Sequence, residues 1–234
     1  MGLAGNGYDW GVATFDTDPI LPPDPDGLEV LHDREYRVQA YRASDEELLI
    51  RGAVRDQEPP GLYLAEDDRP LTIHHMQVEL RVAFPALEIV GAEVLFEAHP
   101  HTSCPRIIDH YGGLVGLSIG RGFTHKVREL FGGPRGCTHT TALLMAMAPV
   151  AVQCSWSMQA SAARRGMSPG PSQASMTAEQ REAIWRSNLN TCHVWAEDGE
   201  QVALLRGGEH LEPPLPIQRR YEELGLGPDG LPVS

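Results

Sequence analysis

The sequence predicts an α+β protein in which an antiparallel sheet from the N-terminal half packs against helices from the C-terminal half. Residues 36–96 contain segments that alternate between apolar and polar side chains, as strands do. Residues 105–163 change to helical patterns with the start and stop signals of helices. Strands followed by helices, rather than alternating with them, are typical of the α+β class.

The strand half predicts a sheet with one face in solvent. Gln77, Glu79 and Arg81 occupy every second position of one strand and give it a polar face. The last two strand segments predict an antiparallel pair joined near Pro85. The four predicted strands cover residues 36–41, 48–56, 73–82 and 89–96.

The helical half predicts three helices in succession. The first opens at Cys104-Pro105, where proline fits the first turn of a helix. The second spans residues 123–130 and ends at a pair of glycines. The third begins near Thr138 and runs toward Ala163, with a kink expected at Pro149.

The remaining segments predict two arms around one domain. Residues 1–33 form an acidic, proline-rich arm, residues 34–205 a single domain, and residues 206–234 a proline-rich, extended tail. Residues 164–176 predict a loop, and Thr177 with Gln180 forms a capping box for a helix that reaches about Asn188. Residues 192–195 and 201–205 predict a late hairpin.

Composition excludes several classes of function. The formal net charge of −13 over 234 residues disfavours binding to nucleic acid or to an anionic membrane, and Lys126 is the only lysine. No secretory signal and no apolar run long enough to cross a membrane is visible. The four cysteines are too few and too spread for a disulfide framework, so we expect a cytoplasmic protein. The terminal arms suggest homodimer contacts and are equally compatible with disorder.

Cys137 and His139 are the most informative candidate residues. They lie two residues apart, after a glycine turn and at the head of the most apolar segment in the chain. A helix N-terminus favours a thiolate or a bound anion, so Cys137 with His139 as its base predicts nucleophilic or acid–base chemistry. The alternative is a buried structural cysteine beside a histidine, because free cysteine is among the most buried residue types.

Two further clusters lie at the ends of predicted elements, where binding sites form. His74 and His75 begin a predicted strand, and only one of them can face a given site because adjacent strand residues point to opposite faces. Cys104 lies in a loop between a strand and a helix. Cysteine and histidine are ordinary ligands of zinc or iron, although their spacing here matches no familiar metal motif. Among the arginines, Arg135 and Arg106 are candidates to bind a substrate carboxylate.

Several segments of the chain carry a resemblance to a known family: residues 51–56, 73–76, 100, 104–105 and 114–123, with residues 132–139 the most specific and a later Cys192 and Trp195. Over roughly residues 34–205 the chain resembles a bacterial family of proteins of unknown function, number 2889. The sequence departs from that family where His75 replaces a usual aspartate, and where residues 140–142 replace Leu-Thr-Glu. These departures imply either changed chemistry or different packing.

The order of elements is also similar to that of iron–sulfur scaffold and sulfur-acceptor proteins. In that fold, ligands from three loops converge at one end of the domain. Placed by order onto this chain, the resemblance implies a metal site of His74, Cys104, Cys137 and His139. The cofactor it implies is a zinc or iron ion.

We therefore expect an enzyme acting on a small-molecule substrate, of lyase, hydrolase or isomerase type, with Cys137, His139 and His75 as catalytic residues. No nucleotide cofactor is expected, because no dinucleotide or Walker motif is present. One alternative is an accessory protein that handles a metal or an iron–sulfur cluster. Another is a domain that binds a partner without catalysis.

Overall fold

The structure is a computed structural model, and it describes residues 15, 19–164, 177, 179, 182, 185–186, 188–209 and 212–227. The chain divides into two compact units, Met1–Trp156 and Ser157–Ser234. The boundary falls inside the range that the sequence predicts as one domain. Each unit is described by itself below.

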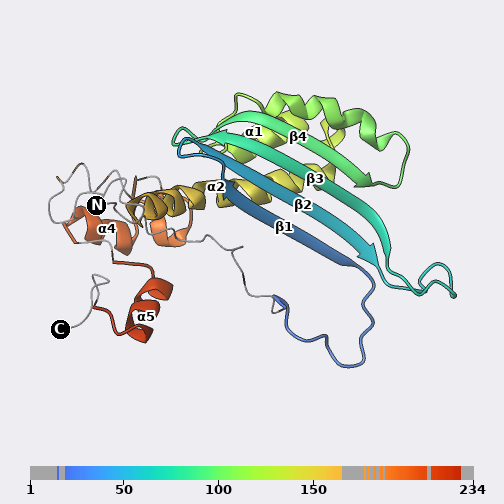
Figure 1. The fold of residues 1–234 in the computed structure, drawn as a ribbon, viewed down its shortest axis with the longest axis horizontal. Coiled ribbons are helices and arrows are strands. Elements are labelled where there is room, and N and C mark those ends of the chain that lie inside the picture. The colour runs from blue at the N-terminus through green and yellow to red at the C-terminus, as the bar shows by residue number, and fades with distance from the viewer. Residues whose placement is uncertain are drawn as a thin grey trace, which may run out of the picture. The chain divides into compact units, whose positions relative to one another are not determined.

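The first unit contains a four-stranded antiparallel sheet in which the strands follow one another in chain order, β1-β2-β3-β4 (Figure 1). This confirms the predicted α+β class, with the sheet in the N-terminal half of the chain. The pairing of successive strands needs only short connections, because antiparallel neighbours are joined by hairpins. The strands are β1 (Asp33–Arg42), β2 (Glu47–Glu58), β3 (Leu71–Ala83) and β4 (Glu88–Ala98).

Alternation along the strands gives the sheet one buried and one open face. Ile50 and Val54 of β2 lie beside Leu80 and Met76 of β3, and all four are buried. The intervening residues form the open face, where Arg51 donates to Glu79 across the strands. This face carries an open hollow of about 460 Å³. The polar alternates of β3 therefore mark the open face, as the sequence predicts.

Helices cover the buried face of the sheet. Figure 1 shows the long helix α2 running behind the strands. The predicted starts at residues 104, 123 and 138 are confirmed, although the first helix is a 3-10 helix, η1, with its proline in the first turn. The elements are η1 (Cys104–Leu114), α1 (Phe123–Phe131), η2 (Gly133–Arg135) and α2 (Thr138–Arg164).

A glycine allows α2 to approach the sheet closely. A Cβ atom on Gly52 of β2 would lie 2.7 Å from Sδ of Met147 and 3.1 Å from Cδ1 of Leu143. Both side chains are fully buried, as are Leu144 and Ala151 on the same helix. The contact fixes α2 against β2, so the first turn of α2 is held at a constant place relative to the sheet.

By length and composition, α2 is apolar enough to cross a membrane over residues 138–162. This corrects the expectation that no apolar run would be long enough. The core helix of a globular domain passes the same test, and 39% of that window is buried inside the protein. The apolar residues of its sheet-facing side are explained by packing.

The described residues of the second unit include a small core and the short helices η4 (His193–Trp195), α4 (Glu200–Arg206) and α5 (Leu215–Glu223). Residues 179, 182, 185 and 186 are helical as well. The core contains Trp185, Val202 and Leu205. The predicted hairpin is wrong, because Val202 and Leu205 are spaced to share one face of a helix and Gly199 precedes its first turn. The predicted extended tail is also corrected, since α5 forms there with a proline in its first turn.

Several predictions lie outside the described residues. They include most of residues 1–18, residues 165–176 of the loop predicted at 164–176, and the last residues of the tail. Residue 164 itself ends α2. The helix predicted from Thr177 to Asn188 is described at only some of its positions. Residues 19–32 are described and are irregular.

Candidate functional site

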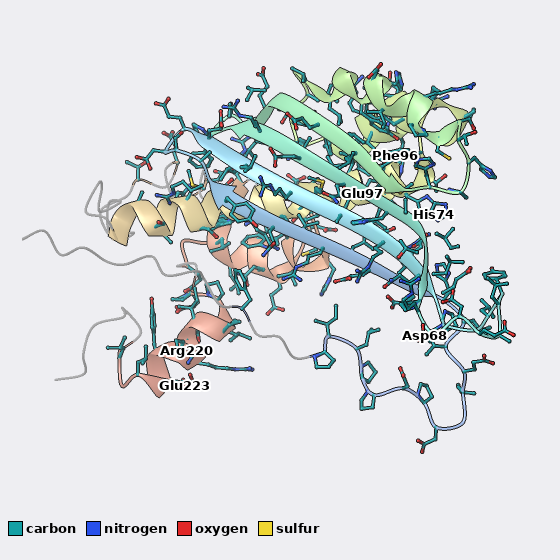
Figure 2. The ribbon with its side chains drawn as sticks, turned by 45° about the vertical axis from the view of Figure 1, so that its right-hand side comes forward. Asp68, His74, Phe96, Glu97, Arg220 and Glu223 are labelled. Atoms are coloured by element: carbon teal, nitrogen blue, oxygen red, sulfur yellow. The ribbon has the colours of Figure 1, made fainter. Side chains whose placement is uncertain are left out.

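A buried carboxylate, Asp56, lies at the centre of a polar cluster where β2 ends and β3 begins. The register of the sheet pairs Arg34 of β1 with Asp56 of β2, and Asp56 with His74 of β3. Paired residues of neighbouring strands point to the same face. Here it is the face that α2 covers, so His139 from the first turn of α2 reaches the same carboxylate. Figure 2 shows His74 near the end of β4, where Phe96 and Glu97 lie.

Arg34 holds the carboxylate in its ionised form. Its Nε donates to Oδ1 of Asp56 at 2.5 Å and its Nη2 donates to Oδ2 at 2.7 Å, which is a two-pronged pair. Burial of Asp56, whose side chain is 1% exposed, would raise its pKa. The hydrogen bonds and charge of Arg34, with the nearby His139 and His74, outweigh burial and lower the pKa from 3.8 to about 2. Asp56 is therefore a carboxylate that only accepts hydrogen bonds at neutral pH.

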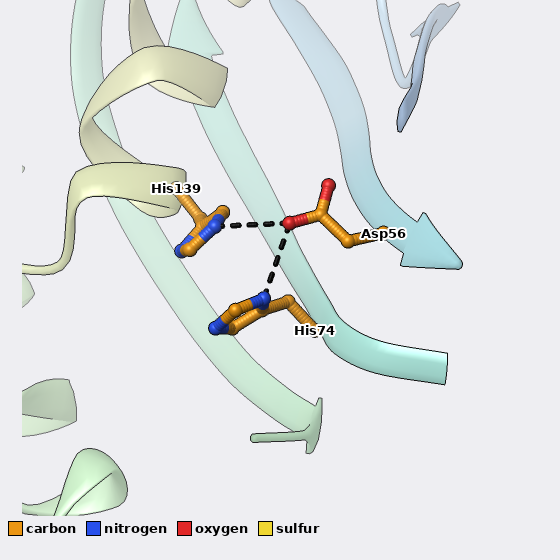
Figure 3. Close-up of side chains that lie close together, drawn as sticks. All are labelled: Asp56, His74 and His139. Atoms are coloured by element: carbon orange, nitrogen blue, oxygen red, sulfur yellow. Dashed lines mark hydrogen bonds and ion pairs between the residues drawn. The ribbon is translucent and has the colours of Figure 1, made fainter. Parts of the chain in front are cut away.

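Two imidazoles share one oxygen of Asp56. Nδ1 of His74 lies 3.1 Å from Oδ2 and Nε2 of His139 lies 3.0 Å from the same atom (Figure 3). The two rings stack, with centroids 3.9 Å apart and an interplanar angle of 27°. Because the carboxylate accepts, each of these nitrogens carries a proton and donates it. A ring that carries only this one proton keeps a free lone pair on its other nitrogen, which is Nε2 in His74 and Nδ1 in His139.

Burial lowers the pKa of His139 below its usual 6.5, and the neighbouring His74 lowers it further. Asp56 acts in the opposite direction and raises the pKa, but by less than the opposing effects. A histidine with a lowered pKa is neutral at neutral pH, which leaves Nδ1 available to take a proton.

The thiol of Cys137 faces the free nitrogen of His139. Sγ lies 3.8 Å from Nδ1, so thiol, imidazole and carboxylate follow one another in series from Cys137 through His139 to Asp56. The main chain is anchored at this point, because the backbone N–H of Cys137 donates to the hydroxyl of Tyr111 at 2.7 Å. Tyr111 is buried and stacks on Phe131 with ring centroids 4.9 Å apart.

Cys137 also marks the N-terminal end of α2. The first helical hydrogen bond runs from the backbone N–H of Thr141 to the carbonyl oxygen of Cys137, at 2.9 Å. The backbone N–H groups of Thr138, His139 and Thr140 therefore have no hydrogen-bond partner within the helix. No other acceptor binds them in the part of the chain that the structure describes. These donors and the helix dipole favour negative charge close to Sγ.

The structure brings together three of the residues that the sequence singles out: His74, Cys137 and His139. His75 is not part of the cluster. Met76 and Val78 are buried on the covered face together with His74, so His75 points to the open face of the sheet. The expectation that only one of the two adjacent histidines faces the site is met by His74.

The other three candidates lie elsewhere. Cys104 begins η1 and is half-buried, and it joins no group of metal-ligating side chains among the described residues. Arg106 is exposed on η1. Arg135 is exposed and its Nη2 donates to the carbonyl oxygen of Arg128 at 3.2 Å, so it fixes the end of α1.

A different set of side chains has the spacing of metal ligands. Atoms of Asp56, His74 and His139 lie within 4.8 Å of one another, and this is the group that the described residues offer to a metal ion. This group shares His74 and His139 with the metal site predicted from the sequence. It has the carboxylate of Asp56 in place of the two predicted cysteines. A metal ion bound there would share the carboxylate with Arg34 and would displace the protons that the imidazoles donate.

Sequence reasoning missed Asp56, Arg34 and Tyr111. For Asp56 a signal was present, because it continues the inward register of Ile50 and Val54, and a charged residue at an inward position requires a buried partner. Arg34 and Tyr111 gave no such signal, since their roles depend on cross-strand register and on tertiary packing. His32 was missed too, and its ring lies 3.7 Å from Asp56.

Fold and site together define an α+β protein with a thiol, two imidazoles and a buried carboxylate at one end of its sheet. A family model described as protein of unknown function (DUF2889) matches residues 32–153, which is more than half of the chain of 234 residues. The chain belongs to this family, and the whole cluster lies within the matched range. No curated protein and no solved structure matches the chain.

Proposed function

We propose that this protein is an enzyme that acts on a small molecule by acid–base chemistry, with His139 and His74 as the proton-transferring groups. The observation that carries the proposal is the pair of imidazoles on one oxygen of Asp56. A carboxylate behind an imidazole fixes the tautomer and directs the free nitrogen away from itself. That arrangement is what a general base requires.

Exposure divides the cluster into a reachable part and a supporting part. The side chains of His139 and His74 are 16% and 20% exposed, whereas that of Asp56 is 1% exposed. A small molecule therefore meets the imidazoles first, and Asp56 acts by positioning them. The lowered pKa of His139 keeps it in the basic form at neutral pH.

The chemistry supports lyase, hydrolase or isomerase reactions, all of which need a proton to be taken and returned. A panel of probes tests this without a known substrate. Simple ketones and hydroxy ketones in D₂O report proton abstraction by the loss of their α-proton signals in NMR spectra, and p-nitrophenyl acetate reports ester cleavage. We expect the wild type to accelerate at least one probe, and His139→Gln to remove the acceleration. Equal rates for wild type and His139→Gln on every probe would refute the proposal.

A metal-handling function is the second candidate, favoured by the spacing of Asp56, His74 and His139. It includes zinc or iron catalysis and the handling of iron–sulfur clusters. An imidazole binds a metal ion in the plane of its ring at about 2.0–2.1 Å. Two rings stacked 3.9 Å apart and inclined by only 27° do not place one ion in both planes, so this candidate requires the rings to turn. Metal analysis of protein purified without oxygen distinguishes the acid–base enzyme from the metal-handling protein. One zinc or iron ion per chain, lost in His74→Ala, favours the metal-handling function.

A further inference from the structure

We propose that Cys137 is a nucleophile that attacks the carbonyl carbon of an ester or thioester and carries the acyl group as an acyl-cysteine. This rests on the proposed function, and it names the substrate class and the covalent step of the same site. The basis is the series of Sγ of Cys137, Nδ1 of His139 and Oδ2 of Asp56, with separations of 3.8 Å and 3.0 Å.

The first step is transfer of the thiol proton. The N–H group at Nε2 of His139 donates a hydrogen bond to the Asp56 carboxylate and keeps its proton. The lone pair on Nδ1 therefore faces Sγ. The thiolate is the reactive form of cysteine, and an adjacent imidazole generates it without a strong external base. Asp56 stabilises the imidazolium that results, while Arg34 keeps the carboxylate ionised throughout.

The second requirement is a place for the negative charge that develops on the carbonyl oxygen. The backbone N–H groups of Thr138, His139 and Thr140 lack acceptors among the described residues and follow Cys137 directly. Thr138 is exposed and His139 is partly exposed, so the start of this turn is reached from solvent, whereas Thr140 is buried. Donors of this kind stabilise a tetrahedral oxyanion, and removing one typically costs about 10²–10³ in rate. The free donors beside Sγ favour a carbonyl substrate over other electrophiles.

The step balances without a cofactor. The S–H bond breaks and its proton moves to Nδ1 of His139, and a bond forms between Sγ and the carbonyl carbon. The tetrahedral intermediate expels the alcohol or thiol, which takes the proton from His139. Water then attacks the acyl-cysteine with His139 as base, which releases the carboxylic acid and restores the thiol. No oxidation or reduction takes place.

The test uses p-nitrophenyl acetate with the full chain and follows the acyl group by mass spectrometry of peptides from briefly reacted protein. We expect one acetyl group on the peptide that contains Cys137, a burst of p-nitrophenol, and loss of both in Cys137→Ser. His139→Gln should slow acylation at least 100-fold near neutral pH, consistent with the usual contribution of about 10²–10⁴ from a general base. Cys192→Ala is the matched control, because that cysteine is exposed in the second unit, and it should acylate at the wild-type rate.

The outcomes separate the covalent step from acid–base function. If Cys137→Ser keeps the wild-type rate and His139→Gln loses it, the nucleophile is overturned and the acid–base function stands. If both variants keep the wild-type rate, both proposals fail. Acetyl groups found on Cys104 or Cys192 at the same rate as on Cys137 would also overturn the nucleophile. Asp56→Asn should slow acylation and shift the pH at which its rate is half-maximal, a readout that a purely structural role would not move.

Discussion

Replacement of Asp56 by asparagine tests the electrostatic account of the site. The substitution keeps the shape of the side chain and removes the charge that Arg34 and the two imidazoles share. The pKa of Asp56 falls from 3.8 to about 2 on folding. Each pKa unit corresponds to about 1.4 kcal/mol, so the ionised carboxylate contributes about 2 kcal/mol to the free energy of unfolding at neutral pH.

The sign of the pH dependence follows from the direction of the shift. A carboxyl whose pKa is lowered by folding stabilises the protein above its unfolded pKa, and the contribution is lost as the pH falls through the folded value. We expect urea unfolding to show Asp56→Asn less stable than wild type by about 2 kcal/mol near pH 7, with the difference shrinking as the pH falls from about 4 toward 2.

Glu79→Gln provides the matched control for this measurement. Glu79 also accepts from an arginine of a neighbouring strand, Arg51, but that pair lies on the open face with side chains 32% and 61% exposed. Solvent weakens an exposed ion pair, so its loss should change stability far less. Equal effects of the two substitutions, or a constant difference for Asp56→Asn between neutral and acid pH, would show that the buried charge of Asp56 does not stabilise the fold.

Three further outcomes are expected. In Gly136→Ala the new methyl group overlaps the main-chain carbonyl oxygen of Phe131 at the end of α1. Urea unfolding should therefore show a lower stability, and iodoacetamide should alkylate Cys137 at a changed rate. His74→Gln removes the neighbouring imidazole that lowers the pKa of His139, so that pKa should rise in an NMR titration; a fall would contradict this cause. Trp185→Ala should destabilise the second unit by about 3–5 kcal/mol, the usual cost of such a deletion in a core, while thiol alkylation in the first unit keeps its rate.

The fold was largely predictable because its elements have strong local patterns. The alternation of Gln77, Glu79 and Arg81 identified the open face of β3, and Pro105 and Thr138 marked the helix starts that the structure confirms. The late hairpin failed because the apolar positions between residues 201 and 205 are too few to distinguish a strand from a single helical face.

The site was predictable only in part, for a physical reason. Cys137 and His139 are neighbours in sequence, and their place at a helix start is a local signal. Asp56 and Arg34 meet through the register of two strands, and that register follows from pairing along the whole hairpin. The alternation of β3 already places His74 with Met76 and Val78, but no local signal shows that Asp56 and His139 lie beside it.

The shared oxygen of Asp56 makes the two imidazoles compete for the same compensating charge. With the rings stacked 3.9 Å apart, a proton gained by one ring opposes a proton on the other. A proton that His139 takes up enters at Nδ1, on the side of Cys137, and the corresponding free position of His74 is Nε2. A substrate that contacts both nitrogens would lose a proton to one of them, and the positive charge gained there would disfavour a second proton on the other.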